Sequence, residues 1–262
     1  EVYGSADNQF SFSEYNGYLR LVTTTRDYES WEQSCGLYIF DEELNMVGHI
    51  DELAKGESIK SSRFLGNMVY FVTFRNTDPL FAVDASNPEN PVIVNEVKLP
   101  GFSEYLHPYG DGLLFGLGYE ADESDGKLRN VKMSMFDISN PADIVEVDRE
   151  QLEAFYSGAM YEHRAMLVNP KRNLIGFAVE ENVIEKDGAG ANVYGRLAQT
   201  YRLYSYDENE GFVQHIECVL DLYSYDYPRA NYIGDYLYIF DGARSVYTYR
   251  LTDYEFLGIT VL

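Results

Sequence analysis

The stretch Phe81-Ala82-Val83-Asp84-Ala85-Ser86-Asn87-Pro88 decides the fold, because its outline returns at Phe136-Asp137-Ile138-Ser139-Asn140-Pro141. In both places an apolar strand ends in an aspartate and a Ser-Asn-Pro turn follows. Four apolar runs end in an aspartate, at 37–41, 80–84, 133–137 and 203–207, and a fifth, 245–250, ends in an arginine. Self-similarity at this period is typical of a radial or solenoidal array of repeats.

Around each run, short apolar segments alternate with turn residues, which predicts four short strands per repeat and therefore a β-propeller. Asn16-Gly17 is the clearest turn, since this pair supplies the positive φ angles of a type I′ hairpin. We predict an all-β fold with a single β-propeller domain over residues 1–262, which can also be part of a larger propeller. Its about five blade-like repeats of four antiparallel strands are placed at residues 8–55, 59–104, 105–159, 162–226 and 229–262.

Two other segments carry expectations of their own. Residues Val2 to Ser5 are expected to pair with another blade and to help close the ring. Residues 148–156 are expected to form a short helix, with Asp148 as its cap and Leu152 on its inner face.

Composition excludes several kinds of partner. The 262 residues carry a net charge of −23, which repels nucleic-acid phosphates and anionic lipid surfaces. No stretch approaches the roughly 20 apolar residues of a membrane span. We therefore predict no nucleic-acid partner and no membrane insertion. Solubility is the simplest interpretation of the charge, and attraction of cations or of basic partners is the alternative.

The two cysteines, Cys35 and Cys218, fall in the first and fourth repeats. These repeats are not neighbours in a ring of five, so a disulfide is not expected. Neither cysteine has Cys or His neighbours at ligand spacing, so no zinc site is predicted. The chain begins at Glu1 without a methionine or a signal peptide, and it is expected to be a processed product or a piece of a longer protein.

Several runs carry a family resemblance: 81–91, 137–141, the segment Leu99-Pro100-Gly101-Phe102-Ser103-Glu104-Tyr105-Leu106-His107-Pro108-Tyr109-Gly110, and Asn8 to Ser11 followed by Glu14 to Arg20. They resemble the bacterial and archaeal family of secreted proteins with a C-terminal β-propeller domain. The resemblance implies a propeller fold and a secreted or cell-surface location. That family is essentially uncharacterised, so it supplies no catalytic residues. Its members usually have further blades before this region.

Basic residues recur near the start of four repeats. Arg63 and His107 each lie three residues before a turn glycine, while His163 and Arg229 open the last two repeats. The first strand of a propeller blade is the innermost and lines the central channel. These four residues are therefore predicted to hold an anion or an acidic ligand group. The alternative is that they donate hydrogen bonds to backbone carbonyls of adjacent blades.

Acidic residues suggest weaker sites. The segments 122–126 and 207–211 combine acids with a glycine, which makes Ca²⁺ binding conceivable, but neither matches the twelve-residue calcium loop. The repeated Asp41, Asp84, Asp137 and Asp207 occupy one structural position, which indicates turn capping rather than an active site. No catalytic residue, no metal site and no cofactor is predicted.

The preferred function is a non-enzymatic extracellular binding or interaction scaffold. Its ligand is expected to be a protein or a carbohydrate, contacted in the channel or by the insertions near 119–130 and 181–198. One alternative is a hydrolase of glycans or related polymers with a channel-facing site. Another is a structural module of a larger cell-surface protein. The fold itself does not choose among them.

Overall fold

The structure is a computed structural model that describes residues 2–27, 29–74, 78–99, 101–110, 112–121, 127–186, 192–220 and 226–262. Contacts divide the chain into two compact units. The first unit comprises Glu1–Arg129 with Ser134–Val147, and the second comprises Asn130–Met133 with Asp148–Leu262. Within the described residues, no helix is long and apolar enough to cross a membrane.

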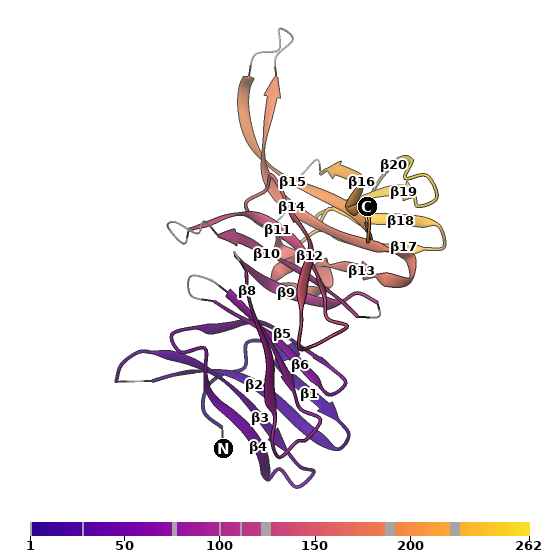
Figure 1. The fold of residues 1–262 in the computed structure, drawn as a ribbon. Coiled ribbons are helices and arrows are strands. Elements are labelled where there is room, and N and C mark those ends of the chain that lie inside the picture. Colours follow the sequence, from indigo (N-terminus) through magenta and orange to yellow (C-terminus); the bar gives the residue numbers. More distant parts are fainter. Residues whose placement is uncertain are drawn as a thin grey trace. The chain divides into compact units, whose positions relative to one another are not determined.

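Five four-stranded antiparallel sheets make up the fold, and in each sheet the strands lie side by side in chain order (Figure 1). The first sheet contains β1 (Phe12–Tyr15), β2 (Tyr18–Arg26), β3 (Gln33–Phe40) and β4 (Met46–Leu53). The second contains β5 (Ser58–Leu65), β6 (Met68–Phe74), β7 (Asp78–Asp84) and β8 (Val92–Leu99). The third contains β9 (Phe102–Pro108), β10 (Leu113–Ala121), β11 (Leu128–Asp137) and β12 (Val145–Gln151).

The fourth sheet contains β13 (Leu167–Asn169), β14 (Leu174–Lys186), β15 (Asn192–Asp207) and β16 (Gly211–Val219). The fifth contains β17 (Arg229–Ile233), β18 (Tyr236–Phe240), β19 (Ser245–Arg250) and β20 (Phe256–Val261). The helical turns described are the 3-10 turns η1 (Gln9–Ser11), η2 (Gly158–Met160), η3 (His163–Ala165) and η4 (Pro170–Arg172). The predicted all-β fold with four strands per repeat is confirmed, and the five repeated runs are the third strands of their sheets.

Turn chemistry explains the strand boundaries. Asn16 and Gly17 have φ angles of 54° and 80°, as the predicted type I′ turn between β1 and β2 requires. The third sheet begins at Phe102 rather than at residue 105, because Phe102 and Ser103 already pair with β10.

The helix expected over residues 148–156 is wrong. Val145–Gln151 is the strand β12, and its side chains alternate between exposed and half-buried positions. Val145 and Val147 alternate with the polar Glu146 and Asp148, a period of two that matches a strand better than a helix. Asp148 caps no helix and instead accepts a hydrogen bond from the backbone N–H of Phe212 at 2.8 Å.

The N-terminal segment pairs with its own sheet, so the expected pairing with another blade is wrong. Ser5 and Thr24 exchange two backbone hydrogen bonds of 2.9 and 3.0 Å, which place the segment beside β2. Gly4 makes this approach possible, since a Cβ atom there would lie 2.5 Å from the carbonyl oxygen of Thr24. Its φ of +101° is also a conformation that favours glycine.

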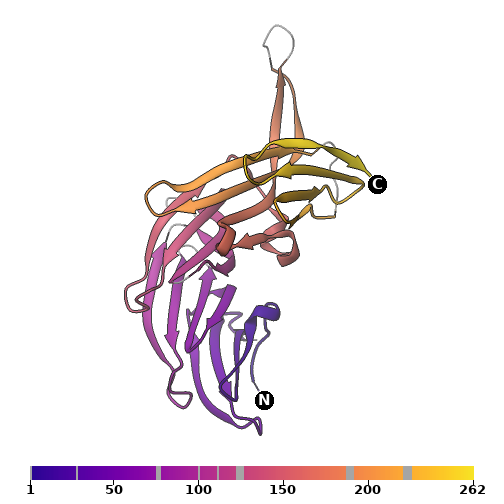
Figure 2. The same cartoon turned by 90° about the vertical axis from the view of Figure 1, so that its right-hand side faces the viewer.

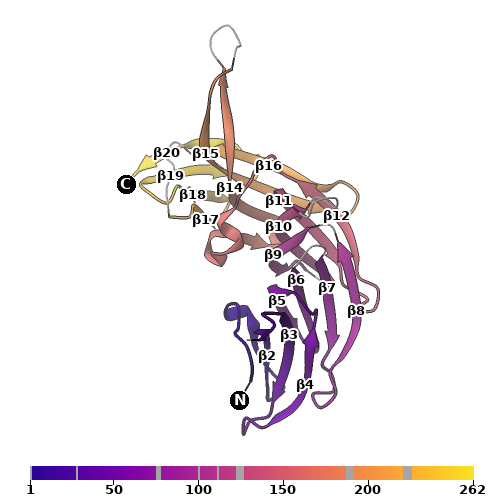
Figure 3. The ribbon, with the colours of Figure 1, turned by 90° about the vertical axis from the view of Figure 1, so that its left-hand side faces the viewer.

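The two predicted insertions join the second and third strands of their sheets, as expected, but much of their length is strand. β10 continues to Ala121 and β11 starts at Leu128, while β14 and β15 remain paired as far as Lys186 and Asn192. Figures 1, 2 and 3 show the β14–β15 hairpin extending as a two-stranded ribbon beyond the other strands of its sheet.

Face-to-face packing of the first two sheets forms the core of the first unit. Leu37 and Ile39 of β3 have no exposed surface and pack with side chains of the second sheet such as Val69 and Phe71. Gly48 allows the turn of the second sheet to come close, because a Cβ atom there would lie 2.0 Å from the carbonyl oxygen of Pro88. The two sheets therefore approach to backbone contact at this point.

The fourth and fifth sheets pack in the same manner in the second unit. Tyr201 and Leu203 of β15 bury their side chains against Leu237 and Ile239 of β18. Cys218 also belongs to this core. As expected, Cys35 and Cys218 form no disulfide, and both are buried. Burial raises the pKa of the Cys35 thiol to about 12, which keeps it protonated and unreactive at neutral pH.

An arginine fastens the first sheet to the second. Arg20 of β2 is 3% exposed, and its Nη1 donates a 2.6 Å hydrogen bond to the carbonyl oxygen of Gly66, in the turn between β5 and β6. Its guanidinium lies 5.0 Å from the ring centroid of Phe64, two residues before that glycine.

The second unit contains the same arrangement. Nη1 of Arg172 donates a 2.6 Å hydrogen bond to the carbonyl oxygen of Gly234, in the turn between β17 and β18. Its guanidinium lies 4.6 Å from the ring of Tyr232, again two residues before the glycine. We call these two contacts, Arg20 to Gly66 and Arg172 to Gly234, the arginine clasps.

Replacing Arg20 by methionine tests the clasp. We expect the free energy of unfolding to fall by about 1.5–3 kcal/mol, because a buried hydrogen bond from a charged donor is lost and the Gly66 carbonyl loses its partner. Urea denaturation measures the change. The control is Lys98→Met, an exposed cation whose removal should shift stability by no more than about 0.5 kcal/mol. Equal effects of the two substitutions would contradict a structural role for the clasp.

Candidate functional site

The candidate site lies where the first strands of the second and third sheets meet in the first unit. β5 contacts β9 and the 3-10 turn η1. Each of the two strands carries one extra residue: the pairing shifts between Ile59 and Ser61 on β5, and Glu104 is skipped on β9. Such bulges turn a side chain away from its normal face. Here the extra residues, Lys60 and Glu104, lie three residues before Arg63 and His107, respectively. Each strand therefore presents a bulge residue and, three residues later, a basic residue.

Arg63 is the most unusual side chain of the site. It is 8% exposed, and its guanidinium lies 3.7 Å from the ring centroid of Phe10 and 4.8 Å from that of Tyr105. Nη1 donates to the carbonyl oxygen of Ser62 at 2.6 Å. Nη2 is buried and has no hydrogen-bond partner among the residues that the structure describes. Within those residues, Arg63 also forms no ion pair, although the protein has a large excess of carboxylates.

Tyr105 and His107 complete this layer. They stand two residues apart on β9 and so share one face of the strand. The Tyr105 hydroxyl and Nδ1 of His107 are 2.8 Å apart, and the two rings stack at 5.9 Å. Burial lowers the pKa of His107 to about 4, and the positive charge of Arg63 lowers it further in the same direction. His107 is therefore neutral at physiological pH, and Arg63 carries the only full charge of the trio.

The bulge residues form a second, mixed-charge layer. Nζ of Lys60 lies 3.4 Å from Oε1 of Glu104 and 5.4 Å from the ring centroid of Phe102. Burial raises the pKa of Glu104, the positive charge of Lys60 opposes this, and the negative charge of Asp7 adds to the rise. Asp7 is an exposed residue, but loss of solvent around its carboxyl raises its pKa as well. Lys60 thus stands between two carboxyl groups that gain protons more readily than usual.

The other two predicted site residues are placed differently. Arg229 begins β17 and is exposed, while His163 lies in η3 and not on the first strand β13. η3 packs against β17 in the second unit. Glu162 lies 3.8 Å from His163, and its pKa falls to about 2, mainly through its hydrogen bond from Arg164 and also through the charge of Arg229. His163 and Arg229 therefore have a carboxylate beside them, Glu162, whereas Arg63 and His107 have none among the described residues.

The alternative role considered for these basic residues, donation to backbone carbonyls of a neighbouring blade, belongs to other arginines. Arg20 and Arg172 fill it in the clasps. This contrast separates clasp arginines, whose guanidinium reaches a turn carbonyl of the next sheet, from Arg63, which bonds the Ser62 carbonyl of its own strand and the side chain of Tyr105.

The repeated aspartates cap turns, as predicted. Oδ1 of each accepts a hydrogen bond from a backbone N–H two to four residues later: Asn45 for Asp41, Ser86 for Asp84, Ser139 for Asp137 and Asn209 for Asp207. The suggested calcium segment 122–126 lies outside the described residues. Among the residues that the structure describes, no cluster of three or more His, Cys, Asp or Glu side chains could hold a metal ion.

Sequence reasoning missed Phe10 and Tyr105. The spacing of Tyr105 and His107 on a predicted strand could have placed the two on one face. The stacking of Phe10 on Arg63 could not have been found, because it depends on how η1 folds back onto β5.

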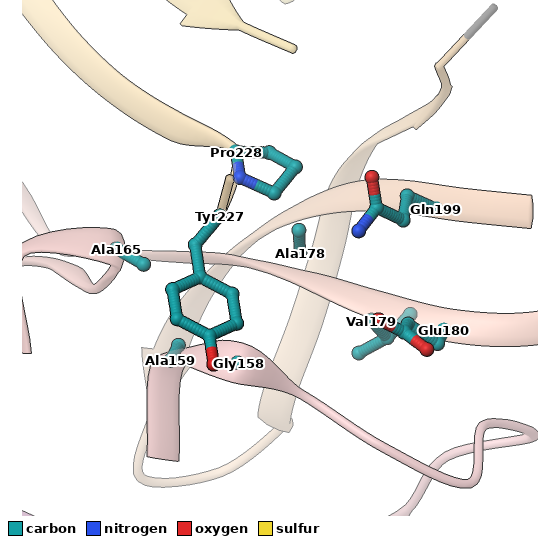
Figure 4. Close-up of a pocket in the computed structure, with 9 residues that line it drawn as sticks. All are labelled: Gly158, Ala159, Ala165, Ala178, Val179, Glu180, Gln199, Tyr227 and Pro228. Atoms are coloured by element: carbon teal, nitrogen blue, oxygen red, sulfur yellow. The ribbon is translucent and has the colours of Figure 1, made fainter. Parts of the chain in front are cut away.

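A small void in the second unit is a packing defect rather than a site. It measures about 10 Å³, room for about one water, and Gly158, Ala178 and Tyr227 line it. Figure 4 shows the Tyr227 ring standing against Gly158 and Ala159. A Cβ atom on Gly158 would lie 2.0 Å from that ring, so glycine is needed for the ring to fit.

Comparison with known proteins identifies the fold family. The sequence matches the family described as Beta propeller domain over residues 1–254. The chain belongs to this family. The predicted propeller fold is confirmed, and the β-propeller domain has relatives in archaea.

An uncharacterised protein of Methanocaldococcus jannaschii is 38% identical over 223 residues, which are 80% of this chain and 35% of that protein. An uncharacterised protein of Archaeoglobus fulgidus is 35% identical over 257 residues, 98% of this chain and 35% of that protein. The chain thus spans about a third of the length of these relatives. Among solved structures, apo AztD from Citrobacter koseri is similar with a TM-score of 0.55 and 17% identity, over 96% of this chain and 59% of that one. This likeness shows the fold alone.

The low pKa of His107 can be measured directly. In an NMR titration we expect the imidazole of His107 to protonate with a midpoint of about 4. Because the unfolded chain binds this proton near pH 6.5 and the folded chain only near pH 4, the stability given by the neutral imidazole is complete above pH 6.5 and is lost toward pH 4. The control is His107→Gln, which should lose less stability over this range. A midpoint at or above 6.5 would contradict the burial argument.

Proposed function

We propose that the protein is a non-enzymatic extracellular binding module, and that Arg63, Tyr105 and His107 hold an anion or an acidic group of its ligand. The extracellular location rests on the resemblance of the Leu99–Gly110 segment to secreted propeller proteins. The observation that carries the proposal is the buried Arg63 guanidinium, whose Nη2 lacks a partner among the described residues.

Electrostatics supports an anion at this point. Moving a guanidinium out of water is costly unless a negative group compensates it. Arg63 is held between two aromatic rings and has no carboxylate partner among the described residues, so an incoming carboxylate or phosphate oxygen would supply the missing acceptor. The net charge of −23 makes such an uncompensated cation still less expected as a purely structural feature.

The neutral His107 adds a hydrogen bond rather than a second charge. It is partly exposed, whereas Arg63 is buried, so a ligand would reach the guanidinium past the imidazole. A bound anion would favour the protonated imidazole, and the pKa of His107 should rise from about 4 when the site is filled.

Titration with acetate, succinate, citrate and inorganic phosphate tests this proposal. We expect saturable binding of at least one of them by calorimetry, with an upward shift of the His107 pKa, and affinity reduced about tenfold or more in Arg63→Met, since the lost contact is a charge-assisted hydrogen bond. Arg172→Met is the matched control, because it removes a clasp guanidinium in the other unit.

Arg63→Met could also unfold the protein, so the His107 pKa of the unmodified chain serves as an independent readout. Binding that leaves this pKa unchanged, equal binding by Arg63→Met in its folded state, or no binding of any of the four anions would overturn the proposal.

A hydrolase of glycans is the second candidate, favoured by the second layer of the site. Glu104 and Asp7 are two carboxyl groups with raised pKa values that influence each other, and a proton held on one acid beside a second acid is what glycoside hydrolysis needs.

Release of reducing ends from a panel of polysaccharides would reveal this activity. Turnover by the wild-type protein that is abolished in Glu104→Gln and kept in Glu96→Gln, an exposed acid of β8, would replace the binding proposal with an enzymatic one. Because the proposed module is non-enzymatic, we expect no turnover in any of the three proteins.

A further inference from the structure

A groove on the first sheet is separate from the site of Arg63 and His107. It has a volume of about 870 Å³, within the range of small-ligand sites. The N-terminal segment, the end of the β2–β3 hairpin and the strand β4 line it, so it lies wholly within the first unit. The proposed function does not use this groove.

An exposed tryptophan stands at the rim of the groove. Trp31 is 68% exposed and has a φ of 62°, a conformation that is strained for a bulky residue. Trp31 itself does not line the groove, but its neighbours Ser30 and Glu32 do, and the guanidinium of Arg26, another lining residue, lies 5.9 Å from the centroid of its ring. Two backbone hydrogen bonds hold the residues on either side: the Trp31 N–H donates to the carbonyl oxygen of Asp27 at 2.9 Å, and the Asp27 N–H donates to that of Glu32 at 2.8 Å.

Asp27 fixes the same loop through its side chain. Its Oδ1 accepts hydrogen bonds from the backbone N–H groups of Glu29 at 2.9 Å and Ser30 at 2.7 Å. These bonds lower the pKa of Asp27, the contact with Ser30 contributing most. Trp31 thus keeps a strained backbone conformation without burying its ring, which is the pattern expected of a contact residue rather than of a core residue.

A second exposed aromatic comes from the N-terminal segment. Tyr3 is 73% exposed and lines the groove. Its carbonyl oxygen accepts hydrogen bonds from the hydroxyls of Thr23 at 3.1 Å and Thr25 at 3.2 Å, which tie the segment to β2. The rings of Trp31 and Tyr3 are therefore both accessible to a ligand without any movement of the sheet.

Polar groups line the groove between them. Tyr38 is 5% exposed, and its hydroxyl interacts with Asp51, Thr23 and Thr25. Burial, and then the hydrogen bond with Asp51, raise the pKa of Tyr38 to about 12, so its hydroxyl both donates and accepts at physiological pH. Nε2 of His49 lies 3.3 Å from Oδ2 of Asp51.

The balance of donors and acceptors selects the class of ligand. The lining carboxylates are Asp27, Glu32, Asp51 and Glu52, and the lining donors are Arg26, Gln33, His49 and Lys55. An anionic ligand would meet an excess of carboxylates. A cationic ligand would compete with contacts already present in the lining, where Nζ of Lys55 lies 2.7 Å from Oε2 of Glu52 and Nε2 of His49 lies 3.3 Å from Oδ2 of Asp51. A ligand rich in hydroxyl groups satisfies both sets, because each hydroxyl donates and accepts. The apolar faces of sugar rings can also pack on exposed aromatic rings.

We propose that this groove binds a neutral oligosaccharide, with Trp31 and Tyr3 stacking on its sugar rings and the residues around Tyr38 and Asp51 bonding its hydroxyls. The site is independent of the anion site at Arg63. It gives the protein a second binding surface on a different sheet.

The single tryptophan of the chain makes the test direct, since Trp31 alone supplies tryptophan fluorescence. The protein is titrated with neutral hexasaccharides of glucose, mannose, xylose and N-acetylglucosamine, and also with oligogalacturonate and hexalysine. We expect a saturable change of Trp31 emission with at least one neutral hexasaccharide, and none with the two charged probes. A response to hexalysine or oligogalacturonate alone, or to none of the six, would overturn the proposal.

Variants separate stacking from non-specific contact. By calorimetry, Trp31→Ala should weaken binding of the active hexasaccharide about tenfold or more, as loss of a central aromatic contact does. The matched control is Leu44→Ala in the same sheet, since Leu44 shares the φ of 62° and is 67% exposed but carries no aromatic ring. Arg63→Met should bind the saccharide normally, which keeps this test apart from the anion site. Unchanged affinity in Trp31→Ala would refute the stacking role and with it the proposal.

Discussion

The structure depends on the packing of one four-stranded sheet against the next. A four-stranded sheet cannot bury its apolar face by itself, so each repeat is stable only when it packs against a neighbour. The cores around Leu37 and Val69 in the first unit, and around Leu203 and Ile239 in the second, meet this need. Close approach of backbones at Gly48 and Pro88 and the arginine clasps then fix how the neighbours sit within each unit.

This packing also explains why both candidate sites lie at the margins of sheets. The faces between sheets are filled with apolar side chains. Polar groups that can bind a ligand are therefore found at the first strands and at hairpin ends. At the first strands, the bulges at Lys60 and Glu104 turn charged side chains toward each other and leave Arg63 beside His107. At the hairpin end, Trp31 lies next to a polar groove, beside Arg26 of its lining.

The sequence predicts features that depend on local periodicity and turn chemistry. The third strands, the type I′ turn at Asn16-Gly17 and the capping role of Asp41, Asp137 and their equivalents follow from residue order alone. The strand at Val145–Gln151 was hidden by a helix-cap pattern, although Val145 and Val147 alternate with polar residues at its start. The bulges, the stacking of Phe10 on Arg63 and the clasps depend on which strand lies beside which, so no local pattern encodes them.

The clasps have a consequence for how such a chain can change during evolution. Both guanidinium groups are received by main-chain oxygens, of Gly66 and Gly234, which every amino acid possesses. The hydrogen bond therefore places no demand on the side chains of the receiving turn, and the side-chain contribution of the receiving repeat comes from the rings of Phe64 and Tyr232 and, in the second clasp, from Asp235 at 3.9 Å from Arg172. Neighbouring repeats can therefore drift apart in sequence while their docking is preserved.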